Sequence, residues 1–99
     1  MKKIMVQFNI PGVTPKQYDQ AWNDLRAAGQ SNPKGLIHHA GAFQGNSLVV
    51  VDVWESQEAF NKFGETLMPI LKKNNFANVP PVVTPVHFEL SGAMAGALH

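Results

Sequence analysis

Two adjacent histidines and an aspartate are the residues of this sequence whose types and spacing could do chemistry. His38 and His39 lie in segment 35–43, which reads as a β-strand, and Asp52 lies in the valine-rich segment 48–55. Neighbouring residues of a strand point to opposite faces of a sheet, so only one imidazole can face a given pocket. A histidine beside a carboxylate can act as a general base, because the carboxylate fixes the tautomer of the ring.

The turn between these two segments decides which histidine shares a face with Asp52. If residues 45–46 form a two-residue turn, His39 lies opposite Asp52. If the turn is longer or bulged, the parity reverses and His38 faces the pocket. Two alanines share a face with His38 and would leave space for a ligand, and they favour His38 as the pocket residue.

A third histidine and a set of aromatic residues complete the candidate site. His87, in the last predicted strand, could reach the same pocket. Tyr18 and Trp22 lie on the apolar face of the first predicted helix, and such side chains suit a flat, mostly apolar ligand. Core packing would also account for Phe63. The predicted ligand-binding residues are Tyr18, Trp22, Trp54, Phe63, Met68 and His87.

Metal, nucleotide and covalent chemistry receive no support from the sequence. The histidines and Asp52 are suitable ligand types, but adjacent histidines of a strand diverge, so we predict no metal site. No phosphate loop, dinucleotide fingerprint or nucleophile elbow is present. The chain has no cysteine, which excludes disulfides, thiolate metal sites and cysteine nucleophiles.

The segments that must position these residues follow the order βαββαβ. Thr14 and Gln17 form a T-x-x-Q capping box that begins the first helix, and Ser56 can cap the second. Pro69 should kink the second helix or start a new one, and Pro85 predicts an edge or bulged position in the last strand. The predicted strands cover 3–10, 35–43, 48–55 and 82–90.

This order predicts an α+β fold with a four-stranded antiparallel sheet and both helices on one face. The other sheet face would be bare, although segment 48–55 is almost continuously apolar. A second copy that packs sheet to sheet would cover it, so we predict a homodimer. We expect one domain over 1–90 and a flexible tail over 91–99.

The composition and the hydropathy of the chain exclude two classes of partner. The chain has 99 residues, of which 44% are hydrophobic and 15% are charged, with a formal net charge of +1. A charge this small does not attract nucleic acid, so we expect no nucleic-acid partner. No apolar run is long enough to span a membrane, and the first residues do not form a signal peptide. We therefore expect no membrane partner and a cytoplasmic protein.

The segment VVVDVWESQEAFNKF, residues 49–63, resembles the strand-to-helix signature of the antibiotic biosynthesis monooxygenase-like proteins. The resemblance implies a ferredoxin-like dimeric α/β barrel, with a ligand pocket between the sheet and the helices of each subunit. That superfamily includes cofactor-free oxygenases, haem-degrading enzymes, isomerases and polyketide cyclases, so the resemblance implies an architecture more sharply than a reaction.

Comparison of individual residues with the pocket residues of these proteins refines the expected function. Trp54 matches the tryptophan that lines the pocket in the oxygenases. Phe60 and Val50 stand where those enzymes have a tyrosine and an asparagine, and neither can donate a hydrogen bond from its side chain. The second helix lacks the histidine that binds haem in the haem-degrading branch. The resemblance therefore implies no haem, and we expect no cofactor.

Two function hypotheses remain. The first is a small cofactor-independent enzyme, monooxygenase-like or isomerase-like, in which His38 or His39 takes a proton from an aromatic or enolisable molecule and Asp52 orients the ring. The alternative is a non-catalytic binding protein for a small apolar ligand. A purely structural dimer would be favoured if packing of the aromatic side chains left no cavity.

Overall fold

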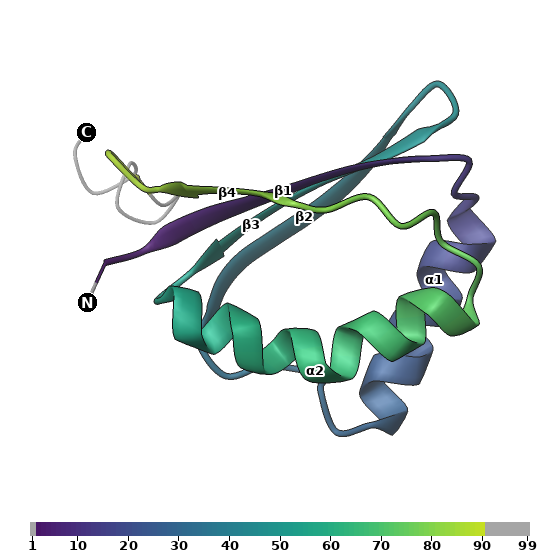
Figure 1. Ribbon diagram of the computed structural model, residues 1–99, viewed down its shortest axis with the longest axis horizontal. Helices are drawn as coiled ribbons and strands as arrows, with labels where there is room; N and C mark the ends of the chain where they lie inside the picture. Colours follow the sequence, from purple (N-terminus) through teal and green to yellow (C-terminus); the bar gives the residue numbers. More distant parts are fainter. Residues whose placement is uncertain (1, 91–99) are drawn as a thin grey trace.

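The computed structural model describes residues 2–90, and the predicted tail 91–99 lies outside the described residues. Four strands and two helices follow the predicted order βαββαβ (Figure 1). They are β1 (Ile4–Pro11), α1 (Pro15–Ala27), β2 (Leu36–Gln44), β3 (Ser47–Trp54), α2 (Gln57–Lys73) and β4 (Val82–Pro85).

The strands form one antiparallel sheet in the order β2-β3-β1-β4. Both helices cover the same face of this sheet (Figure 1). The sheet of one chain is open, with β2 and β4 at its edges. The predicted ferredoxin-like α+β fold is therefore confirmed.

Both helices begin at the predicted caps. The Thr14 hydroxyl accepts a hydrogen bond from the Gln17 backbone at 3.2 Å, and the Thr14 backbone donates to the Gln17 side chain at 2.9 Å. At the start of α2, Ser56 Oγ accepts from the Ala59 backbone at 3.1 Å. These bonds satisfy backbone donors that a helix start leaves without partners.

The structure corrects the prediction of a possible new helix at Pro69, because α2 continues without interruption to Lys73. A proline removes only one backbone donor from a helix. The apolar side of α2 stays packed on the sheet through Phe60, Phe63 and Leu67, and most helical stability comes from such packing.

The last strand is shorter than predicted, since β4 ends at Pro85. It pairs with β1 only, from Ile4 to Gln7, which confirms the edge position expected from Pro85. Within residues 2–90, no strand pairs with the second half of β1 on this side. That half therefore borders the space between the sheet and α2.

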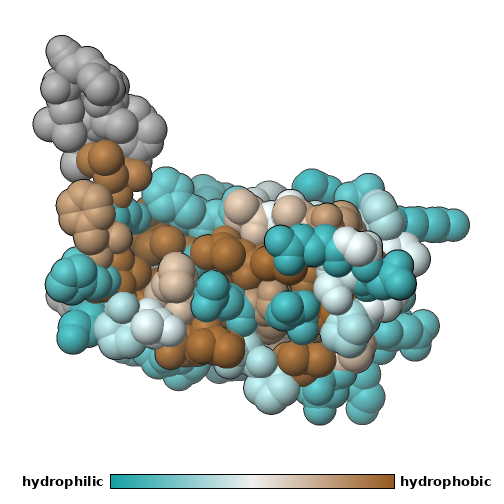
Figure 2. All heavy atoms as spheres, turned by 90° about the horizontal axis from the view of Figure 1, so that it is seen from above, coloured by the Kyte–Doolittle hydropathy of each residue, from teal (hydrophilic) through white to brown (hydrophobic). Residues whose placement is uncertain are grey.

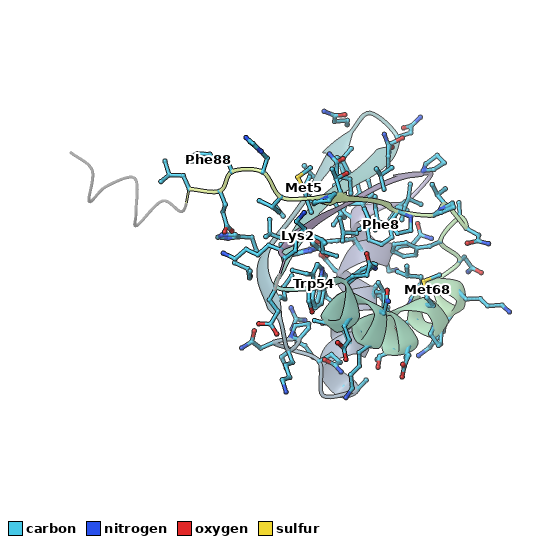
Figure 3. All side chains as sticks on the ribbon, turned by 60° about the vertical axis from the view of Figure 1, so that its left-hand side comes forward. Lys2, Met5, Phe8, Trp54, Met68 and Phe88 are labelled. Carbon is cyan, nitrogen blue, oxygen red and sulfur yellow. The ribbon has the colours of Figure 1, made fainter. Side chains whose placement is uncertain are left out.

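The core lies between the sheet and the helices. In Figure 3, Phe8 and Trp54 point into this space, whereas Met5 lies on the other side of β1. On that other face the apolar side chains of β3 and β1 are only half-buried and those of β2 are exposed, and brown side chains gather across it in Figure 2. The buried residues of the two central strands are Ile4, Val6, Phe8, Ile10, Leu48, Val50, Asp52 and Trp54.

Candidate functional site

The β2-β3 hairpin places His39, not His38, on the face that the helices cover. Gly45 has φ 58° and Asn46 has no positive φ, as in a type II′ turn, so His39 lies opposite Asp52 and His38 opposite Val53. The strand pairing is irregular only beyond His38, between Leu36 and His38. Of the two registers considered, the first is confirmed, and the preference for His38 is wrong.

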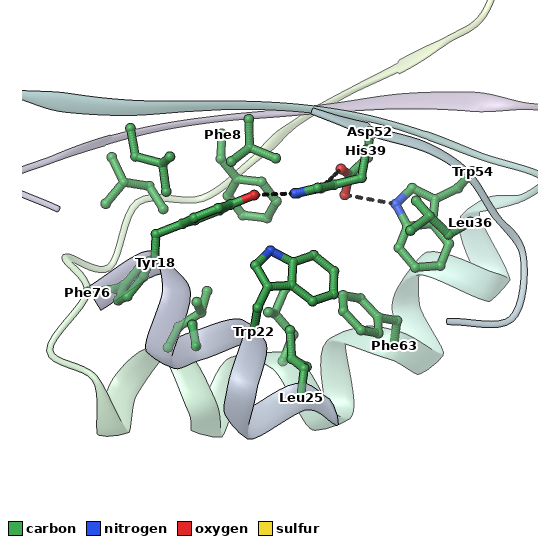
Figure 4. Close-up of a pocket in the computed structure, with 16 residues that line it drawn as sticks. Phe8, Tyr18, Trp22, Leu25, Leu36, His39, Asp52, Trp54, Phe63 and Phe76 are labelled. Carbon is green, nitrogen blue, oxygen red and sulfur yellow. Dashed lines mark hydrogen bonds and ion pairs between the residues drawn. The ribbon is translucent and has the colours of Figure 1, made fainter. Parts of the chain in front are cut away.

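His39 lies at the centre of a chain of short hydrogen bonds (Figure 4). Its Nδ1 is 2.6 Å from Asp52 Oδ1, and its Nε2 is 2.6 Å from the Tyr18 hydroxyl. The other carboxylate oxygen, Oδ2, accepts from the indole nitrogen of Trp54 at 3.2 Å. Asp52 is only 5% exposed, and both its oxygens have partners, as burial of a carboxylate requires.

These partners indicate how the protons are placed. An ionised Asp52 can only accept, so His39 Nδ1 carries the hydrogen that is donated to it. The lone pair of the neutral ring then lies on Nε2, where it accepts the hydroxyl hydrogen of Tyr18. The basic nitrogen of His39 therefore points toward α1 and the space beneath it.

Burial raises the pKa of Tyr18 above 10.0, and the negative charges of Asp52 and Asp19 act in the same direction, while the Trp22 side chain opposes them. Tyr18 accordingly stays a neutral phenol at ordinary pH. Trp22 also meets the His39 ring edge to face, with 4.9 Å between ring centres. Two aromatic side chains of α1 thus hold the imidazole in place from the helix side.

A cavity of about 60 Å³ opens beside this chain. Apart from the polar atoms of Tyr18, Trp22, His39, Asp52 and Trp54, its wall is hydrocarbon. Six of the predicted site residues line it, and they come from α1, both hairpin strands and α2. These are Tyr18, Trp22, His39, Asp52, Trp54 and Phe63.

Three predicted site residues lie elsewhere. His38 is half exposed on the outer sheet face, where its Nε2 is 3.5 Å from Glu89 Oε2. His87 is exposed beyond β4, because the strand that should have carried it ends at Pro85. Met68 is 51% exposed and lines a separate groove along α2. Among residues 2–90, no three potential ligand side chains gather as a metal site would need.

The sequence reasoning missed Gly41, which lies on β2 beneath the ring of Tyr18. A Cβ atom at this position would lie 2.6 Å from the Tyr18 hydroxyl oxygen and 2.9 Å from Cζ, which is too close for unchanged packing. The missing side chain therefore lets Tyr18 reach His39. A glycine inside a strand is a signal of such a close approach.

No protein-family model and no curated protein matches this sequence. Among solved structures, SnoaB from Streptomyces nogalater, described as a cofactor-independent oxygenase, superposes with a TM-score of 0.68 at 14% identity, over 91% of this chain and 98% of that one. A proposed antibiotic biosynthesis monooxygenase from Chloroflexus aurantiacus gives 0.64 at 15% identity, over 90% and 97%.

A dimeric ferredoxin-like protein from an uncultured marine organism gives a TM-score of 0.63 at 12% identity, over 92% of this chain and 93% of that one. At such low identity these structures show the fold alone. No transmembrane helix is found among the described residues. The resemblance predicted from the sequence is thus confirmed for the architecture, and this chain has the ferredoxin-like fold of the antibiotic biosynthesis monooxygenase-like proteins.

Proposed function

We propose that this protein is a small cofactor-independent enzyme, monooxygenase-like or isomerase-like, that removes a proton from an aromatic or enolisable molecule. The observation that carries the proposal is the Tyr18–His39–Asp52 chain beside an apolar cavity. An imidazole with one nitrogen held by a carboxylate is an arrangement suited to general-base catalysis, because its tautomer and orientation are fixed. The likeness to SnoaB supports this general kind of reaction and names no substrate.

In the proposed reaction, His39 Nε2 receives the proton. It does so directly after Tyr18 turns aside, or through Tyr18, whose hydroxyl gives its hydrogen to Nε2 as it takes one from the substrate. Asp52 stabilises the imidazolium that forms, since its carboxylate lies 2.6 Å from Nδ1. The resulting enolate or phenolate keeps the electron pair of the broken bond. It either takes a proton back at a different atom, which isomerises it, or uses this pair to form a C–O bond to dioxygen, which is reduced to a hydroperoxide group that takes up the proton held by His39.

The test uses a probe that does not require the natural substrate. Exchange of the α-hydrogens of β-tetralone in deuterated water, followed by NMR, measures proton abstraction alone. We expect His39→Gln and Asp52→Asn to slow this exchange about a hundredfold or more, the usual contribution of a positioned base. His38→Gln is the matched control and should exchange at the wild-type rate, because His38 lies on the outer face.

Equal exchange rates in wild type and His39→Gln would contradict the proposal. If wild-type protein bound β-tetralone without any exchange, the alternative of a non-catalytic binding protein for a small apolar ligand would replace it. The largely hydrocarbon wall of the cavity is compatible with that alternative.

We further propose that the protein acts as a homodimer. The outer face of the sheet carries Met5, Val49, Val51 and Val53, which are only half-buried in one chain. Figure 2 shows apolar side chains gathered on one face of the molecule. Such a face is typical of a protein interface, and the marine relative in fold is described as dimeric. Sheet-to-sheet packing of two copies would cover it and leave the cavity on the helix side.

A further inference from the structure

The cavity beside His39 is smaller than the molecule it is proposed to bind. Its volume of about 60 Å³ corresponds to about two water molecules in the liquid. Pockets for small-molecule ligands usually measure roughly 300–1,000 Å³. A substrate that reaches His39 must therefore extend beyond this cavity.

A groove of about 830 Å³ adjoins the cavity and shares part of its wall. Phe8, Ile10, Leu71 and Phe76 line both spaces, so the cavity and the groove lie side by side along the same apolar side chains. Further out, the groove is bordered by Met68 and by segment 75–79, which follows α2. Its outer rim carries Lys72, Asn75 and Asn78, whose polar groups meet the solvent.

The topology explains why this groove exists. Since β4 pairs with β1 only over Ile4–Gln7, the second half of β1 has no strand beside it on that side within residues 2–90. After α2, Asn75 has φ 64°, and the Phe76 backbone donates to the Leu71 carbonyl at 3.0 Å. This turn places Phe76 between groove and cavity. The groove lies on the helix side and stays uncovered in the proposed dimer.

We infer that the substrate has a polar enolisable or phenolic head and an elongated apolar tail, with the tail in this groove. The inference rests on the proposed function for the head, which lies against Tyr18 and His39. The tail passes Phe8 and Phe76 and lies along Met68. An elongated molecule with its head at His39 fits this path along the shared apolar side chains.

The test measures binding of para-alkylphenols, from para-methylphenol to para-octylphenol, by isothermal titration calorimetry. If the alkyl chain enters the groove, each added methylene should tighten binding roughly fourfold until the groove is filled. Met68→Glu places a charge in the groove and should flatten this gradient while para-methylphenol binds within twofold of wild type. Lys16→Glu, at an exposed residue of α1 outside both spaces, should keep the full gradient.

A second variant covers the case in which the alkyl chain enters the groove without contacting the half-exposed Met68. Ala77→Trp fills the groove from its other wall and should also flatten the gradient. Affinity that is flat across the wild-type series, no binding of any member, or a gradient that both variants leave unchanged would overturn the inference. A groove-dependent gradient without β-tetralone exchange would instead overturn the proposed function and leave the groove as a binding site.

Discussion

Tyr18 is the one tyrosine of the chain, so its ionisation can be followed directly by the ultraviolet absorbance of the phenolate. We expect a midpoint above 10.0 in the folded protein, because burial and the Asp52 charge disfavour the phenolate. Because the pKa of Tyr18 is higher in the folded than in the unfolded protein, Tyr18 contributes stability that is fully present below pH 10.0. This contribution is lost as the pH rises through the folded pKa. Unfolding in urea should return the midpoint to about 10.

Asp52→Asn provides the control for this titration. It removes the Asp52 charge, which is one cause of the raised pKa of Tyr18, and leaves the burial of Tyr18 unchanged. Its midpoint should lie between those of the folded wild type and the unfolded chain. A wild-type midpoint at or below 10.0 would show that Tyr18 is solvated or points away from the cavity.

Gly41→Ala should displace Tyr18 from His39. The new methyl group would lie 2.6 Å from the hydroxyl oxygen, and overpacking of this kind costs about 1–3 kcal/mol. We expect lower stability in urea unfolding, a Tyr18 midpoint nearer 10, and slower β-tetralone exchange. Gly64→Ala is the matched control, because a Cβ there meets no atom within 4 Å and should stabilise α2 by up to about 1 kcal/mol. An unchanged Tyr18 midpoint in Gly41→Ala would contradict the assigned role of the glycine.

The residue types of the site could be predicted from the sequence, but the choice between the two histidines could not. A two-residue turn at Gly45 was one of two permitted registers, and a shift by one residue exchanges the faces of a whole strand. Ala40 and Ala42 suggested space for a ligand, yet they lie on the outer face opposite Val51 and Val49. Small side chains leave space, and the sequence alone does not say on which face of the sheet that space lies.

A polar contact joins the two helices at the end of α2. Asn74 donates to Asp24 Oδ2 at 2.9 Å, and Lys73 lies 3.6 Å from the same oxygen. The hydrogen bonds from Asn74 and Gln20 lower the pKa of Asp24 below 3.8, and Lys73 adds to the effect. Asp24 therefore contributes stability above pH 3.8 that is lost as the pH falls through its folded pKa.

Urea unfolding from neutral pH down to below pH 3.8 tests this contact. We expect Asp24→Asn to be less stable than wild type at neutral pH and to converge with it in acid. Asp19→Asn, an exposed position on the same helix, should follow the wild-type curve. If the stabilities of wild type and Asp24→Asn changed with pH in parallel, the Asp24 carboxylate would not stabilise the packing of the two helices.

Helix starts were predictable because capping acts between residues three apart, as at Thr14 and Gln17. The end of the last strand was not. The alternation of side chains in the last predicted strand continues to residue 90. A strand, however, also needs a neighbouring strand to pair with its backbone N–H and C=O groups. Since β1 begins at Ile4, opposite Pro85, regular pairing ends there, and a single bond from the Val86 backbone to the Lys3 carbonyl follows. Long-range pairing of this kind leaves no local signal.

At the scale of the whole molecule, the two faces of the sheet have separate uses. The helix face holds Asp52 and the cavity, and the outer face carries the half-buried valines of β3. Strict alternation along β3 serves both faces at once, since every second residue is buried and the others are half-buried. An almost continuously apolar strand in an open sheet is therefore accounted for by the proposed second copy.

Val51 provides the test of that dimer, because it lies opposite Gln7 on β1 and Ala40 on β2, at the middle of the outer face. A lysine there would bury an unpaired charge between two sheets, which is costly without a partner. We expect wild-type protein to sediment as a dimer and Val51→Lys to sediment as a folded monomer with an unchanged circular dichroism spectrum. Gln20→Lys, on the exposed side of α1, should remain dimeric. A dimer that survives Val51→Lys would place the interface elsewhere, and a monomeric wild type would leave the outer face to a different partner.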